Sequence, residues 1–184
     1  YAIRLDGEKD GFADAAYRVD LTPEHAAKTE HSSGLKAGGL QWEVPEGTWK
    51  IYTMHLSRNF GYHRSYINMM DAKSCKVLLD AVYEPHYSHY KELFGTTIAG
   101  FFSDEPEMGN GHIYETEDGF GTMIDFPWSM ELAEKLTEKI GEDNFWKLAL
   151  LWEEHAKKDL TAEVRYAYMD SVTRLVSKDF SEQI

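Results

Sequence analysis

The chain has 184 residues, 42% of them hydrophobic and 14% aromatic, which suits one folded domain with a core and excludes a disordered chain. The net charge of −13 argues against a nucleic-acid backbone or an anionic membrane surface as partner, because phosphates are bound by Lys and Arg. No apolar run approaches the roughly 18 residues that would span a bilayer. The single cysteine, Cys75, excludes an internal disulfide, and its helical surroundings predict a small core residue.

The first 47 residues are predicted to be rich in β-structure. Short strands are expected within residues 1–21 and a polar loop at 22–38. Residues 40–44 and 48–56 alternate around Pro45-Glu46-Gly47, which predicts a hairpin. Because the chain opens in the pattern of a strand and closes in the pattern of a helix without a stop signal, we expect an excised piece of a larger protein.

A strand–helix–strand unit is predicted next. The helix follows a polar and aromatic loop at 57–70, with Asp71 as N-cap, Pro85 as a kink or break, and Gly95 at its C-terminal end. An apolar strand is predicted at 96–103. Strand, helix and strand in this order predict a parallel pair with a right-handed crossover.

The rest of the chain is predicted to be a loop followed by helices. A glycine-rich, acidic stretch at 107–128 is long for a connection, which indicates an inserted functional loop. Three helices follow, the first of them capped by Ser129. We predict one α/β domain over residues 1–184, in which 1–47 are a β-rich decoration and 48–184 are βα units that carry the inserted loop.

The segment TTIAGFFSDEPEMGN, residues 96–110, runs from apolar residues directly into Asp104, Glu105 and Glu107. A strand that is apolar on both faces is typical of a parallel sheet, where ligands bind beyond the carboxyl ends of the strands. Three roles for the acids stay open. They provide a general acid for a glycosidic oxygen, paired with a second carboxylate; they bind Ca²⁺ or Mg²⁺; or they form a solvated strand end.

The flanking loops favour a sugar site. Arg58, Asn59 and His63 precede the first helix, and Trp128 follows the acids. Trp128 has a structural alternative as a hydrophobic staple before Ser129, and His63 has one as an exposed polar residue. His86 and His89 lie three apart on the predicted helix without a third ligand nearby, so we predict surface residues and no metal site.

Several motifs carry a family resemblance when taken together: WEVPEGTW at 42–49, FGTT at 94–97 and FSDEP at 102–106, followed by FPWSMELAEKL and EVRYAYMDSVTRLVSKDFSEQI. Over roughly residues 15–184 the chain resembles the core of large bacterial glycoside hydrolases, namely the family 106 α-L-rhamnosidases and their uncharacterised relatives. The resemblance implies a partial (β/α)8 barrel, TIM-barrel-like, with a β-hairpin decoration near the N-terminus and with the strand at 96–103 as about its fourth.

The same resemblance implies the roles of the two acids. Glu105 is the expected general acid, and Asp104 binds substrate or tunes the pKa of Glu105. Arg58, Asn59, His63 and Trp128 are the sugar contacts expected from the residue types of the flanking loops, not from the resemblance. The second catalytic carboxylate is expected on a later strand that this chain lacks, so the chain is expected to be inactive alone.

The resemblance also implies a periplasmic or extracellular bacterial enzyme with a carbohydrate substrate and no cofactor, Ca²⁺ being a possible ligand of the intact enzyme. No nucleic-acid or membrane partner is expected. Because a partial barrel leaves bare sheet edges, a homo-oligomer through those edges is expected. The alternative is a non-catalytic carbohydrate-binding or interaction domain, in which the acidic strand end is structural or binds a cation.

Overall fold

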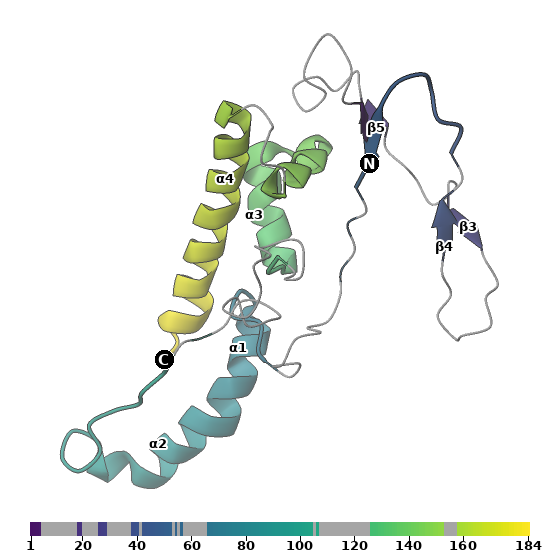
Figure 1. The fold of residues 1–184 in the computed structure, drawn as a ribbon. Helices are drawn as coiled ribbons and strands as arrows, with labels where there is room; N and C mark the ends of the chain where they lie inside the picture. The colour runs from purple at the N-terminus through teal and green to yellow at the C-terminus, as the bar shows by residue number, and fades with distance from the viewer. Residues whose placement is uncertain are drawn as a thin grey trace. The chain divides into compact units, whose positions relative to one another are not determined.

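The computed structural model describes residues 1–4, 18–19, 26–28, 38–40, 42–52, 54, 56, 66–104, 106, 126–152 and 158–184. The chain divides into two compact units, the first made of Tyr1–His55 and Glu153–Thr161, the second of Leu56–Trp152 and Ala162–Ile184. The described strands belong to the first unit, and most of the helical residues belong to the second (Figure 1).

Two small antiparallel sheets make up the described part of the first unit. In one sheet the order is β2-β1-β5, formed by Arg18–Val19, Ala2–Arg4 and Trp49–Ile51. In the other, β3 (Ala26–Lys28) pairs with β4 (Gly38–Leu40). The central strand β1 places Ala2 and Ile3 in the core with no exposed surface. The short strands predicted within residues 1–21 are therefore confirmed.

The predicted hairpin around Pro45 is wrong in its pairing. The chain bends at residues 46–47, as the turn residues predict, and Gly47 has a φ of 128° that favours glycine. The flanking strands, however, pair elsewhere: β5 pairs with β1 and β4 pairs with β3. The predicted loop at 22–38 thus contains β3. A turn signal fixes a local bend, whereas the pairing partner depends on contacts far apart in sequence.

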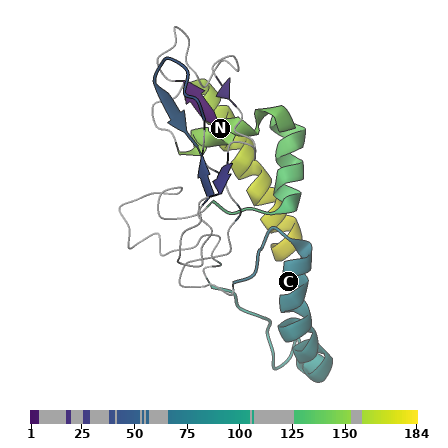
Figure 2. The same cartoon turned by 90° about the vertical axis from the view of Figure 1, so that its right-hand side faces the viewer.

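Near the start of the second unit, four consecutive helical elements form one continuous helix, which we call the rod (Figures 1 and 2). It consists of α1 (Ala72–Leu78), the π-helical turn η3 (Leu79–Tyr83), α2 (Glu84–Tyr90) and the 3-10 turn η4 (Lys91–Leu93). The rod matches the single helix that the sequence predicts between residues 71 and 95.

The predicted signals at the two ends of this helix are confirmed. Asp71 is the N-cap, and its Oδ1 accepts a hydrogen bond of 2.9 Å from the Lys73 amide. Pro85 lies in the first turn of α2, where its missing amide costs least, and the π turn directly before it takes up the change of register. Gly95 follows the rod with a φ of 78°, a conformation that glycine adopts readily.

The strand predicted at 96–103 is not formed. Residues 95–97 form a turn, Ile98 makes one isolated parallel bridge to Phe94, and residues 99–104 belong to no ladder. Phe102 is 86% exposed. A strand needs a neighbour for its backbone groups, and none of the described strands pairs with this segment. The parallel pair is thus missing from the described residues, and the partial (β/α)8 barrel stays a prediction.

The three predicted C-terminal helices are confirmed, the middle one as a 3-10 helix. They are α3 (Met130–Ile140), η6 (Glu142–Leu151) and α4 (Lys158–Val176), and the π turn η7 (Ser177–Ser181) extends the last. Ser129 caps α3, because its Oγ accepts a bond of 3.0 Å from the Leu132 amide. Helical spacing places one face of each in the core: Leu132, Leu136, Ile140, Trp146, Leu150, Val164, Tyr168, Val172 and Leu175 are buried.

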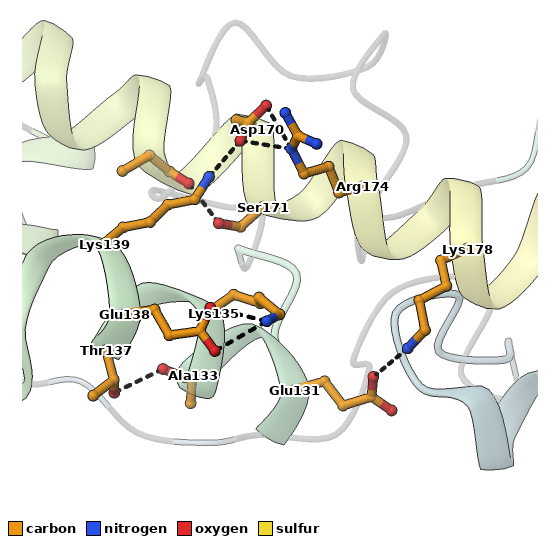
Figure 3. Close-up of polar contacts among 11 residues, drawn as sticks. Glu131, Ala133, Lys135, Thr137, Glu138, Lys139, Asp170, Ser171, Arg174 and Lys178 are labelled. Carbon is orange, nitrogen blue, oxygen red and sulfur yellow. Dashed lines mark hydrogen bonds and ion pairs between the residues drawn. The ribbon is translucent and has the colours of Figure 1, made fainter.

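Helices α3 and α4 lie side by side in both views (Figures 1 and 2). One ion pair joins α3 to α4, between Lys139 and Asp170, and a second joins α3 to the π turn η7, between Glu131 and Lys178 at 3.4 Å (Figure 3). The start of α3 therefore meets the residues just beyond α4, so the helices are antiparallel. Arg174, followed by Lys139, holds the pKa of Asp170 below its usual range. Such exposed pairs add little stability, and they define the register of the two helices.

Tyr168 anchors the segment that leads into α3. Its ring is 2% exposed and packs edge-on against Phe126, with a centroid separation of 5.6 Å. Its hydroxyl donates a bond of 2.6 Å to the carbonyl of Pro127. Burial raises the pKa of the Tyr168 phenol far above its usual value. One side chain of α4 thus fixes the residues directly before the cap of α3.

We expect Tyr168→Phe to lower the free energy of unfolding by about 1 kcal/mol, because the Pro127 carbonyl loses its donor. The difference should shrink at high pH. In the folded protein the phenol keeps a proton that the unfolded chain releases above pH ~10. The tyrosine therefore contributes fully below that pH, and its contribution is lost as the pH rises further. Urea unfolding of both proteins from pH 7 to pH 11 measures the two effects. If the difference in free energy of unfolding between them stays constant over this range, the predicted pH dependence is contradicted.

Candidate functional site

The structure describes two of the six predicted site residues. Asp104 is exposed at the end of the unpaired segment that follows the helical rod. Trp128 lies directly before Ser129, the cap of α3. The predicted general acid Glu105 and the predicted sugar contacts Arg58, Asn59 and His63 lie outside the described residues. The roles of all six stay predictions.

The described contacts of Trp128 are structural. Its half-buried ring packs edge-on against Phe145 of η6, with a centroid separation of 6.4 Å. Its backbone carbonyl accepts a bond of 2.9 Å from Nδ2 of Asn68. The hydrophobic staple that the sequence offered as an alternative would pack this ring on α3 itself; the described ring contact is with η6, so the staple stays a prediction. Trp128 thus helps to fix the point at which the chain enters α3.

Asn68 joins the segment before α1 to the segment before α3, and sequence reasoning missed it. Its Oδ1 accepts a hydrogen bond of 3.1 Å from the backbone amide of Met70. Its own backbone amide donates a hydrogen bond of 2.9 Å to Ser74 Oγ. Its Nδ2 reaches the carbonyl of Trp128, sixty residues further along the chain. The turn-forming bond to the second residue on is typical of Asn before a helix, and it could have indicated the first half of this role.

A small core lies beneath the start of α1. Cys75 is 2% exposed and contacts Met69 and Phe180 in a cluster, and its Sγ donates a 3.6 Å bond to the Asn68 carbonyl. Burial, with a further contribution from Asp179, raises the pKa of the Cys75 thiol. The prediction that Cys75 is a core residue is confirmed. A thiol in this state is a poor nucleophile, because the thiolate is the reactive form.

Asp179 is a buried carboxylate that sequence reasoning also missed. It is 1% exposed, and its Oδ1 lies 3.1 Å from Nζ of Lys178. Its Oδ2 has no hydrogen-bond partner among the residues that the structure describes. The hydrogen bond to Asp179 raises the pKa of Lys178, and Glu131 raises it further. Nothing in the sequence marks this acid, since it stands in a polar helix end.

The two histidines of the rod lie on its surface, as predicted. His86 and His89 are exposed, and both rings contact Tyr90. Nδ1 of His86 lies 2.6 Å from the Val82 carbonyl. Within the described part of the chain, no three His, Cys, Asp or Glu side chains are grouped so that they could hold a metal ion.

Comparison with known proteins finds no family model, no curated protein and no solved structure that matches the chain. Among the described helices, none combines the length and the apolar character that a membrane span requires.

We expect Asn68→Ala to lower the free energy of unfolding by about 1–3 kcal/mol, because the Met70 amide and the Trp128 carbonyl both lose a partner. Asn68→Asp should be at least as unstable at pH 7, since it sets a carboxylate against the Trp128 carbonyl. Urea unfolding measures both variants, with the exposed Thr173→Ala on α4 as control. We call the hydrogen bond between Asn68 and the Trp128 carbonyl the clamp. If Asn68→Asp shifts the urea midpoint no more than the control does, the clamp does not contribute to stability.

We expect Lys178→Met to lower the urea midpoint, because it leaves a buried carboxylate without its cation. Asp179→Asn in the same chain should restore part of the loss by removing the buried charge. Lys135→Met is the matched control, since Lys135 forms a 2.9 Å pair with Glu138 on the exposed face of α3 (Figure 3). Equal midpoints for Lys178→Met and Lys135→Met would show that Asp179 does not depend on Lys178.

Proposed function

We propose that the chain is part of the catalytic domain of a bacterial glycoside hydrolase that acts on polysaccharide in the periplasm or outside the cell. One observation carries the proposal: the acids Asp104 and Glu105 come directly after an apolar segment and are followed by Pro106, within a set of motifs that resembles the family 106 α-L-rhamnosidases. In the described structure Asp104 is exposed to solvent, which is consistent with access for a large sugar substrate.

In this proposal Glu105 is the general acid. Cleavage of a glycosidic bond needs a proton on the leaving oxygen as the bond breaks, and a carboxylic acid supplies it when its pKa is raised. A neighbouring negative charge raises the pKa of a carboxyl group, and Asp104 provides such a charge. The second carboxylate, which acts as base or nucleophile, is proposed to lie on a later strand outside this chain.

A second candidate function is a non-catalytic carbohydrate-binding or interaction domain. The conformation of the segment before the acids favours it. Residues 99–104 are unpaired and Asp104 is exposed, as a solvated acidic end would be. In that case the acids are structural or bind a cation, and the sugar contacts Arg58, Asn59, His63 and Trp128 act without chemistry.

The test is hydrolysis of aryl glycosides, aryl α-L-rhamnoside included, and of plant polysaccharides by the full-length protein that carries this sequence. Glu105→Gln should lower kcat by roughly 10²–10⁴-fold, which is the usual contribution of a general acid. An aryl glycoside with an acidic leaving group should be affected least, since its oxygen needs no proton. Asp104→Asn should shift the alkaline limb of the pH–rate profile to lower pH.

The matched control is Glu107→Gln, which removes an acid from the same run and should leave kcat within a few-fold. Near-normal turnover in Glu105→Gln would overturn the assignment of the general acid. Sugar binding without turnover in the unsubstituted protein, unchanged by Glu105→Gln, would favour the binding domain instead.

A further inference from the structure

We draw no further inference here: the strongest candidate, the partly exposed side-chain cluster of Tyr87, Phe94 and Phe101 at the end of the rod, carries none, because nothing in the described part of the structure shows what covers it.

Discussion

One hydrogen bond, from Nδ2 of Asn68 to the carbonyl of Trp128, fixes the backbone at one of the two proposed site residues that the structure describes. It joins the residues before α1 to the segment before α3, two points that are sixty positions apart. The stretches predicted to carry the sugar contacts and the inserted loop are attached to the chain at these two points. The other bonds of Asn68 attach it to the start of α1: its Oδ1 accepts from the Met70 amide, its backbone amide donates to Ser74 Oγ, and its carbonyl accepts from the Asp71 amide. One asparagine thus ties the start of α1 to the point where the chain enters α3.

Beneath this clamp the second unit is stabilised mainly by apolar burial. The stripes of α3 and α4 place Leu132, Leu136 and Val172 in the core, and Tyr168 extends that core to the segment before α3. The ion pairs on the exposed side contribute less, because water screens them. Asp179 differs from these pairs, since a buried carboxylate costs free energy unless a cation stays close to it. The helix end at Lys178 is therefore held by electrostatics as well as by packing.

Local signals in the sequence predicted local structure well, and they failed where partners are distant. Asp71, Pro85, Gly95 and Ser129 act through neighbours within four residues, and each does what its chemistry predicts. The pairing of β5 with β1 and the missing strand at 96–103 depend on residues far along the chain, which a pattern of side chains does not specify. The same limit applies to the site. The run of acids is visible in the sequence, whereas the reach of Asn68 to Trp128 and the burial of Asp179 exist only after folding.

The π turn η3 has a consequence for how this helix can change in length during evolution. A π turn is an α-helical turn with one residue in excess, whereas one residue in a regular α-helix corresponds to a rotation of about 100° around the helix axis. Because the wider turn takes up the excess residue, Tyr87 and Tyr90 of α2 keep nearly the direction, relative to α1, that a continuous α-helix one residue shorter would give them. Loss of one residue from the π turn would therefore leave both tyrosines on the same side of the helix. Loss of one residue from the regular turns of α1 would instead rotate them by about 100° relative to the start of the helix at Asp71.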